Sequence, residues 1–230
     1  MPSTPHIVSD VMTRAVAAVA REARFKEIVR LMQERNVSAL PVLDGPGHVV
    51  GLVSEADLLP KEEFRDSDPD RRTQLRRLPD LAKAGGLTAD ELMTSPALTV
   101  RPDATLAQAA RTMARAGVKR LPVVDGAGLL RGIVSRGDLL KVFLRDDEDI
   151  ADEIRRDVLP YLPPPVSSVL VGVRDGAVTL RGRIPDTALV PVAARLVRAV
   201  EGVVDVDFDL DTHGLSSTTP TAAAPSAPHR

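Results

Sequence analysis

Two tetrapeptides of one form, Ser54-Glu55-Ala56-Asp57 and Ser135-Arg136-Gly137-Asp138, hold the residues best suited to bind a ligand. Each follows an apolar stretch typical of a buried strand and begins a stretch typical of a helix. The first residues of a helix carry unpaired amides and a partial positive charge, which favour an anion such as a phosphate. An acid one turn further on could bind the hydroxyls of a ribose. The alternative is a plain capping box, in which the Ser and the Asp only close the helix end.

A duplication surrounds the two tetrapeptides. One offset of 81 positions relates many pairs of segments, among them Asp57 and Asp138, Leu40–Gly45 and Leu121–Gly126, and Met12-Thr13 and Met93-Thr94. A constant offset over many positions indicates a duplicated structural unit. Two copies in the same context favour the ligand-binding interpretation over the plain cap.

Composition limits the class of protein. The chain has 230 residues, of which 43% are hydrophobic and 27% charged, as in a folded protein of two ordinary domains or of one duplicated domain with a small addition. The net charge of −2 gives no reason to expect a nucleic-acid binder. The absence of cysteine excludes disulfides, thiolate zinc sites and a cysteine nucleophile. The sequence shows no export signal, and no apolar run approaches the roughly 20 residues of a membrane span, so we expect a cytoplasmic protein.

Both repeats are expected to fold in the order strand, helix, strand, strand, helix, the first over residues 8–59 and the second over 89–144. In the first repeat a strand is expected over 15–20, and apolar residues at helical spacing predict an amphipathic helix over 24–35. In the second repeat, Thr105-Leu106-Ala107-Gln108 is a candidate capping box. The tandem βαββα order predicts an α/β (α+β) fold.

A charged segment, residues 60–88, separates the two repeats and is expected to be a connecting insert with one helical turn near Arg72–Leu78. Its two arginine pairs, Arg71-Arg72 and Arg76-Arg77, could contact a ligand phosphate. Charge runs more often form a solvated surface, so a solvated linker is preferred.

Both repeats resemble CBS domains, named after cystathionine β-synthase. The matching motifs are the Met-Thr start, the Leu-Pro-Val strand and the Gly-x-x-Ser-x-x-Asp-Leu-Leu end. Two such domains in tandem imply a CBS pair with pseudo-two-fold symmetry and clefts for an adenosyl ligand. The resemblance implies that Asp57 and Asp138 bind ribose, and that Ser54 and Ser135 bind phosphate or ribose. It also implies an adenine nucleotide (AMP, ADP or ATP) as regulatory ligand and a homodimer formed through the CBS pairs.

The two clefts are expected to be unequal. Near the second box stand basic residues where the first repeat has neutral or acidic ones, for example Arg136 in place of Glu55. A cation beside a phosphate is favourable and a glutamate is not, so the second cleft is expected to hold the charged nucleotide. Its candidate ligand-binding residues are Thr99, Pro102, Lys119, Arg120, Pro122, Ser135, Arg136 and Asp138, against Ser54 and Asp57 in the first.

Residues 147–211 are expected to form a small third module of the order αββαβ. Asp175-Gly176 between two apolar runs is a strong hairpin signal. A second helix is expected to be capped by Gly202, although Pro191 is awkward inside it. Over Val204–Asp211 apolar residues alternate with aspartates, which predicts a strand with one buried face. These aspartates are interpreted as solvated rather than as a calcium site, because spacing along a strand spreads the carboxylates apart.

The third module resembles a BON domain. The matching segments are Asp175–Gly182 and Glu201–Val206. The family is associated with phospholipid or macromolecular contacts. Because the aspartates would repel an anionic bilayer, we expect an unknown protein partner and no membrane. Residues 212–230, rich in Ser, Thr, Pro and Ala, are expected to be a disordered tail.

These patterns predict a regulatory protein in which the CBS pair senses an adenine nucleotide and the BON module passes that state to a partner. Two alternatives stay open. One is a structural or interaction protein whose clefts bind nothing tightly, and the other is a membrane-surface adaptor that acts through the third module. The four histidines share no spacing, and no catalytic constellation, metal site or prosthetic group is predicted.

Overall fold

The structure, a computed structural model, describes residues 6–65, 77–162, 169–182 and 187–210. The chain divides into two compact units, one formed by residues 4–141 and the other from residue 142 onward. The expected tail, 212–230, lies outside the described residues. Among the helices of the described ranges, none is long and apolar enough to cross a membrane.

The first repeat has the predicted order of elements. They are α1 (Val8–Val11), β1 (Val19–Ala20), α2 (Phe25–Arg35), β2 (Ala39–Asp44), β3 (His48–Ser54) and α3 (Glu55–Leu58). The strands form one sheet in the order β1-β2-β3, with β1 parallel and β3 antiparallel to β2. Ile28 and Met32 of α2 are buried in the core of this repeat, as the helical spacing predicts. The strand expected over 15–20 is shorter, because only Val19 and Ala20 pair with β2.

The second repeat has the same order. Its elements are α7 (Ala89–Leu92), α8 (Leu106–Ala116), β4 (Arg120–Val124), β5 (Leu130–Ser135) and α9 (Arg136–Leu140). A single parallel bridge between Val100 and Val123 takes the place of β1 and repeats the β1·β2 pairing one offset later. The predicted cap of α8 is formed, since Gln108 N donates to Thr105 Oγ1 at 3.2 Å. The tandem α+β fold expected from the sequence is confirmed.

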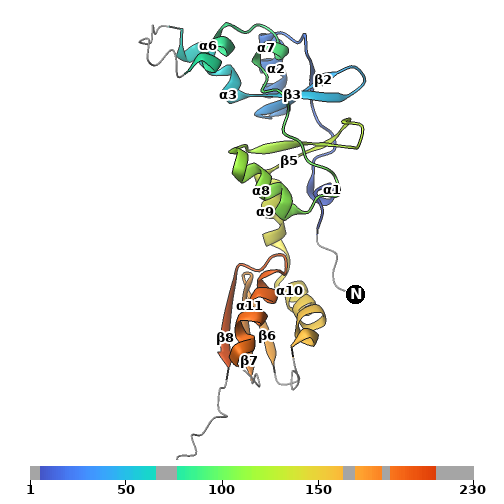
Figure 1. The fold of residues 1–230 in the computed structure, drawn as a ribbon, viewed down its shortest axis with the longest axis vertical. Coiled ribbons are helices and arrows are strands. Elements are labelled where there is room, and N and C mark those ends of the chain that lie inside the picture. The colour runs from blue at the N-terminus through green and yellow to red at the C-terminus, as the bar shows by residue number, and fades with distance from the viewer. Residues whose placement is uncertain (1–5, 66–76, 163–168, 183–186, 211–230) are drawn as a thin grey trace, which may run out of the picture. The chain divides into compact units, whose positions relative to one another are not determined.

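Each repeat is completed by a segment that belongs, in sequence, to the start of the other. Thr13 packs on the second repeat, where it exchanges two backbone hydrogen bonds of 2.9 Å with Ile133. Thr94 packs on the first repeat, where it pairs in the same way with Leu52. Figure 1 shows the consequence: α1 lies beside the second repeat and α7 beside the first. The two repeats are therefore interleaved rather than merely joined.

Two glycines make room for this exchange. A Cβ on Gly51 would lie 2.2 Å from Met93 Sδ, and a Cβ on Gly132 would lie 2.6 Å from Met12 Sδ. Both separations are far shorter than a van der Waals contact. A Cβ at either glycine of the two Gly-x-x-Ser motifs would therefore force the crossing methionine to move.

The insert folds onto the first repeat. Its described part contains α4 (Pro60–Glu63) and α6 (Leu78–Gly85), while residues 66–76 lie outside the described residues. Lys61 Nζ donates to the Ala84 carbonyl at 2.8 Å, and Arg77 forms ion pairs with Glu63 and Asp80. These contacts hold the described helices of the insert to each other, and the Lys83–Asp57 ion pair holds α6 to the first repeat, unlike the solvated linker that the sequence suggested. The turn expected near Arg72–Leu78 lies mostly outside the described residues.

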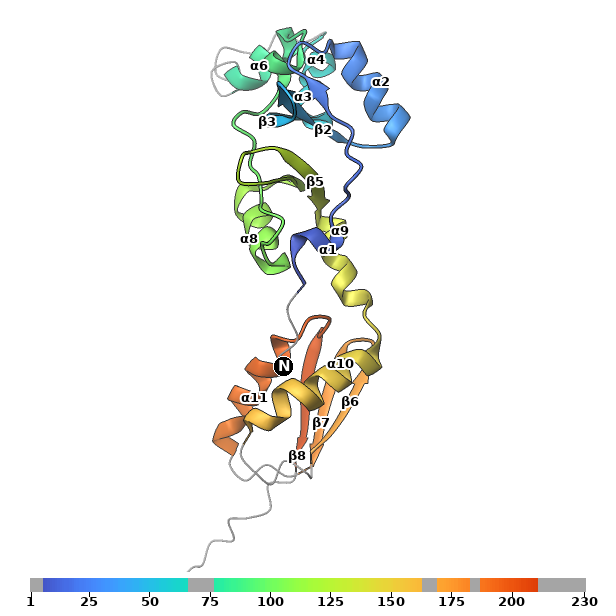
Figure 2. The same cartoon turned by 90° about the vertical axis from the view of Figure 1, so that its right-hand side faces the viewer.

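The second unit has the predicted order αββαβ. After the 3₁₀ turn η1 (Lys141–Leu144), its elements are α10 (Asp147–Glu153), the π-helical and 3₁₀ turns η2 (Ile154–Val158) and η3 (Leu159–Tyr161), β6 (Leu170–Arg174), β7 (Ala177–Gly182), η5 (Thr187–Leu189), α11 (Val190–Arg198) and β8 (Asp205–Leu210). β7 is the central strand, antiparallel to β6 and parallel to β8. Figure 2 shows α10 and α11 on one face of this sheet, and Ile150, Leu180 and Val197 lie in the core between them. The predicted hairpin turn is present, with positive φ at both Asp175 and Gly176.

The ends of α11 differ from the sequence expectation at one residue. Pro191 lies in the first turn, where a missing N–H breaks no helical hydrogen bond, so it fits the helix. Gly202 is not the cap, because α11 ends at Arg198 and Ala199 occupies the cap position. Gly202 instead has a φ of 93° and packs against Ile150. A Cβ added to Gly202 would lie 2.8 Å from the Cδ1 of Ile150.

Candidate functional site

The second site (Ser135 and Asp138) lies where β5 ends and α9 begins. Asp138 Oδ2 accepts hydrogen bonds from the backbone N and the Oγ of Ser135, at 2.9 and 2.7 Å. Asp138 N donates in return to Ser135 Oγ at 3.2 Å, which completes the box. The other oxygen, Oδ1, accepts from Lys141 Nζ at 2.8 Å. The Asp138 side chain is 15% exposed and that of Lys141 58%, so a largely exposed cation holds the outer oxygen.

Asp138 is ionised in this setting. Burial acts to raise the pKa of its carboxyl, but the hydrogen bonds from Lys141 and Ser135 outweigh burial and hold the pKa below its ordinary value. The carboxylate is therefore charged at neutral pH. It can accept a charge-assisted hydrogen bond from the hydroxyl of a ligand.

The backbones of all three predicted phosphate-binding cations lie next to this site, but one of the three side chains is directed away from it. Arg136 N donates to the Lys119 carbonyl at 3.0 Å, so the start of α9 adjoins the residue before β4. The Arg136 guanidinium donates through Nε to the Val118 carbonyl at 3.1 Å, and both cations are exposed. Arg120 is the ladder partner of Ser135 across β4 and β5, but its side chain is directed to the first repeat, where its Nη2 donates to Ser38 Oγ.

The remaining predicted residues of the second site, Thr99, Pro102 and Pro122, belong to the neighbouring strand pair. Pro122 lies in β4, and its carbonyl accepts from Val100 N at 3.0 Å. Thr99 and Pro102 lie on either side of Val100 in the sequence. Within the described ranges, no hydrogen bond or ion pair links these three residues to the Ser135–Asp138 box. The structure thus gathers only part of the predicted set around Asp138.

The first site (Ser54 and Asp57) contains the same box with different outer partners. Asp57 Oδ2 accepts from the N and Oγ of Ser54 at 2.8 and 2.7 Å. Asp57 Oδ1 accepts from Lys83 Nζ and, at 3.1 Å, from Thr94 Oγ1. Asp57 is only 9% exposed. Its carboxylate is therefore buried against an ammonium group that the insert supplies.

Sequence reasoning missed both lysines. Lys141 lies three residues after Asp138, a helical spacing that could have indicated the pair. Lys83 comes from α6, 26 residues after Asp57, and no local pattern connects the two. Only the packing of the insert on the first repeat brings Lys83 to the site.

The aspartates of β8 are used within the sheet. Asp205 Oδ1 and Asp207 Oδ1 each accept from the backbone N–H of the following residue, at 2.8 and 2.9 Å. Asp209 forms an ion pair of 3.3 Å with Arg181 of β7. Asp211 lies outside the described residues. In the part of the chain that the structure describes, no group of three or more His, Asp or Glu side chains could hold a metal ion.

A pocket of about 220 Å³ lies in the first repeat between α2, α3 and α4. It is lined by Val29, Met32, Gln33, Glu55, Leu58, Leu59 and Glu62. Neither Ser54 nor Asp57 lines it, so this pocket is separate from the first site.

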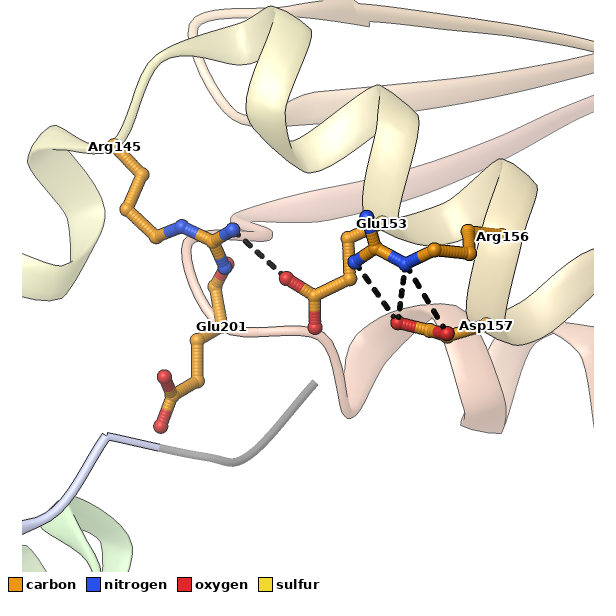
Figure 3. A network of polar contacts seen from close by, with 5 residues as sticks. All are labelled: Arg145, Glu153, Arg156, Asp157 and Glu201. Carbon is orange, nitrogen blue, oxygen red and sulfur yellow. Dashed lines mark hydrogen bonds and ion pairs between the residues drawn. The ribbon is translucent and has the colours of Figure 1, made fainter. Parts of the chain in front are cut away.

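A polar network fixes the segment that leads into α10 (Figure 3). Arg145 Nη2 donates to Glu153 Oε2 and Arg145 Nη1 to the Glu201 carbonyl, both at 2.8 Å. Arg156 pairs with Asp157 at 3.1 Å in the same network. The side chains of Arg145 and Glu153 are 20% and 12% exposed. Arg145 therefore ties this segment both to α10 and to the loop between α11 and β8.

Comparison with known proteins identifies the family of each part of the chain. The CBS domain family matches residues 8–61 and 89–145, and the BON domain family matches residues 146–212. The uncharacterized protein MJ1426 of Methanocaldococcus jannaschii is 30% identical over 154 residues, which are 60% of this chain and 91% of that protein. CBSX2, a chloroplastic CBS domain-containing protein of Arabidopsis thaliana, is 32% identical over 155 residues, 61% of this chain and 64% of its own length. A crystal structure of CBSX2 in complex with AMP superimposes with a TM-score of 0.54 at 33% identity, covering 60% of this chain and 97% of that one.

Two interleaved βαββα repeats, each with a Ser-Asp box where its last strand meets its last helix, define a CBS pair. The αββαβ module that follows them defines a BON domain. The chain therefore belongs to the CBS domain family and carries a BON domain after its CBS pair.

Proposed function

We propose that this protein is regulatory and that its CBS pair binds an adenine nucleotide, AMP, ADP or ATP, at the second site. The observation that carries the proposal is the environment of Asp138. One oxygen of this carboxylate is fixed by the box, and the other is held by an exposed lysine. A ribose hydroxyl can join or replace Lys141 there, because the displaced ammonium returns to water. The AMP complex of CBSX2 supports the choice of ligand class.

The phosphate of the nucleotide would meet the exposed cations around the same box. Lys119 and Arg136 adjoin through their backbones, and Lys141 lies one turn beyond Asp138. A guanidinium has five N–H donors, so the contact from Arg136 Nε to Val118 leaves others for a phosphate oxygen. At the equivalent places the first repeat has Ser38, Glu55 and Pro60, none of them a cation.

Binding at the second site would bias the BON module by a population shift. α9 carries Asp138 and runs on in sequence through η1 to Arg145, the anchor of the BON module. A ligand that binds one conformational state more tightly shifts the equilibrium by that difference in affinity. The output would go to a protein partner in the cytoplasm, where adenine nucleotides are available. The proposal involves no catalysis, prosthetic group or metal.

One observation favours a second candidate function. Asp57 is buried and its two oxygens are bound by Ser54, Lys83 and Thr94, as in a site that only stabilises the fold. If the second site were used in the same way, the protein would be a structural or interaction protein without a ligand. A membrane-surface adaptor is less favoured, because the exposed aspartates of β8 would repel an anionic bilayer.

Thermal unfolding with candidate ligands tests the proposed function. AMP, ADP and ATP are expected to raise the melting temperature, because a ligand selective for the native state stabilises it by mass action. S-adenosylmethionine and cyclic dinucleotides serve as comparison ligands. Tyr161 is the only tyrosine and the chain has no tryptophan, so its fluorescence reports on the BON module alone. A ligand-dependent shift of that signal supports the relay, and no shift of any signal with any ligand would favour the structural alternative.

We also propose that the protein is a homodimer formed through its CBS pairs. Leu59 and Leu140 occupy the same place in the two repeats and are 63% and 60% exposed, and Leu59 also lines the 220 Å³ pocket. A matching pair of exposed apolar side chains is typical of an interaction surface. Leu59→Glu is expected to shift the protein from dimer to monomer in sedimentation experiments. Leu87→Glu, at a side chain that is 65% exposed, is the matched control and should leave the dimer intact; a monomeric wild type would refute the proposal.

A further inference from the structure

The two boxes differ in how completely their carboxylates are occupied. A carboxylate has about four positions at which it can accept a hydrogen bond. Asp57 receives four donors: the N and Oγ of Ser54, Lys83 Nζ and Thr94 Oγ1. Asp138 receives three within the described residues: the N and Oγ of Ser135 and Lys141 Nζ. A ligand hydroxyl thus finds a place on Asp138 but has to displace a donor from Asp57.

The two lysines are also held differently. Lys141 belongs to the same helical turn as its carboxylate and is 58% exposed, so it can leave for water. Lys83 is 19% exposed and also donates to Thr94 Oγ1 at 3.1 Å. It is carried by α6, which the contact from Lys61 Nζ to the Ala84 carbonyl joins to α4, the helix that directly follows the first repeat. Removing Lys83 from Asp57 therefore requires its side chain, or α6 itself, to move away.

The insert that supplies Lys83 follows only the first repeat. The second repeat is followed in sequence by η1 and the BON module, and Lys141 takes the corresponding position on Asp138. The buried ammonium group on Asp57 is thus supplied by the insert and adds to the difference in basic residues between the two motifs.

We propose that Lys83 is a built-in occupant of the first site, which keeps ribose hydroxyls from Asp57 and limits the CBS pair to one nucleotide per chain. The proposal rests on the proposed function, since it explains why only the second site is used. Lys83 determines the number of sites and does not itself contact the nucleotide. Displacement of α6, by a partner or by modification of Lys83, would open the first site.

Calorimetric titration of the full chain with AMP tests this proposal. The wild type is expected to bind about one AMP per chain. Lys83→Met removes the ammonium and keeps most of the side-chain volume, so a second binding event should appear, at least tenfold tighter than any second event in the wild type. Lys83→Arg is the matched control, because a guanidinium can still donate to Asp57, and it should bind one AMP. Adding Asp57→Asn to Lys83→Met should remove the extra event and assign it to the first site.

The buried Asp57 could make Lys83→Met unstable, so circular dichroism should accompany the titration. If the variant does not fold, Lys83→Gln replaces it, because an uncharged and shorter donor still satisfies Asp57 while yielding more readily to a ligand. If the wild type and the folded variant, Lys83→Met or Lys83→Gln, each bind a single AMP, the role of Lys83 is overturned and the proposed function stands. Two equal sites in the wild type would also overturn the role of Lys83. Failure of AMP to bind any of these proteins would instead contradict the proposed function.

Discussion

Asp138→Asn is expected to weaken AMP binding by about 30-fold, which corresponds to the roughly 2 kcal/mol of a hydrogen bond to a charged group. The asparagine keeps the size of the side chain and can still accept from Ser135 N, so the helix cap is largely preserved. It loses the negative charge that attracts both Lys141 and a ribose hydroxyl. The free energy of unfolding should therefore fall by no more than about 1 kcal/mol.

Asp57→Asn is the matched variant for this experiment, because Asp57 occupies the same place in the other repeat. Its acceptor positions are filled by Ser54, Lys83 and Thr94, so AMP affinity should change less than twofold. Calorimetry on the two variants separates the roles of the sites. Unchanged affinity in Asp138→Asn would leave that residue as a plain cap. A large loss in Asp57→Asn alone would mean that the nucleotide binds the first site.

The repeats, their order of elements and the Ser-Asp boxes could be predicted from the sequence, because each is a local pattern. A strand, a helix start and a cap are all set by residues within one or two turns of one another. The offset of 81 positions then placed the two boxes in equivalent environments. The hairpin at Asp175-Gly176 was predictable for the same reason, since both residues adopt the positive φ that this turn requires.

The sequence predicted unequal basic residues at the two sites, but the occupation of Asp57 could not be predicted, because it depends on a contact with a distant segment. Lys83 reaches Asp57 only after α6 packs on the first repeat. Arg120 was assigned to the second site from its position in the sequence, but the fold directs its guanidinium to Ser38. The crossing of Met12 over Gly132 likewise leaves no local trace. Repeat symmetry predicts where a site lies, and the segments inserted between the repeats decide what that site can bind.

The aspartates of β8 show the same limit in the BON module. Their alternation indicated one buried face, and Val206 is buried while Asp205, Asp207 and Asp209 are exposed. Val204 was expected on the buried face, but it lies before β8 and is 64% exposed. The sequence suggested solvated aspartates and a protein partner. In the structure Arg181 offsets the charge of Asp209, while Asp205 and Asp207 accept from backbone N–H groups of the same strand and keep their charge. An edge strand whose polar groups are capped in this way is protected against pairing with another chain.

Arg145→Met is expected to lower the free energy of unfolding of the BON module by about 2 kcal/mol. Arg145 is 20% exposed and makes two hydrogen bonds of 2.8 Å, one to the carboxylate of Glu153 and one to the Glu201 carbonyl. Hydrogen bonds to charged groups each contribute roughly 1.5–3 kcal/mol, and methionine retains the apolar part of the side chain without the donors. The loss should therefore come from the donors and not from packing.

Urea unfolding followed by Tyr161 fluorescence measures this effect, because Tyr161 is the only tyrosine and lies within the BON module. Arg198→Met is the matched control: Arg198 is exposed near the end of α11, and its loss should change the stability by less than about 0.5 kcal/mol. Equal midpoints for Arg145→Met and Arg198→Met would show that the Arg145 network adds nothing to stability. A lower midpoint for Arg145→Met alone would show that the segment joining the CBS pair to the BON module is held to that module by Arg145, as a relay between the two requires.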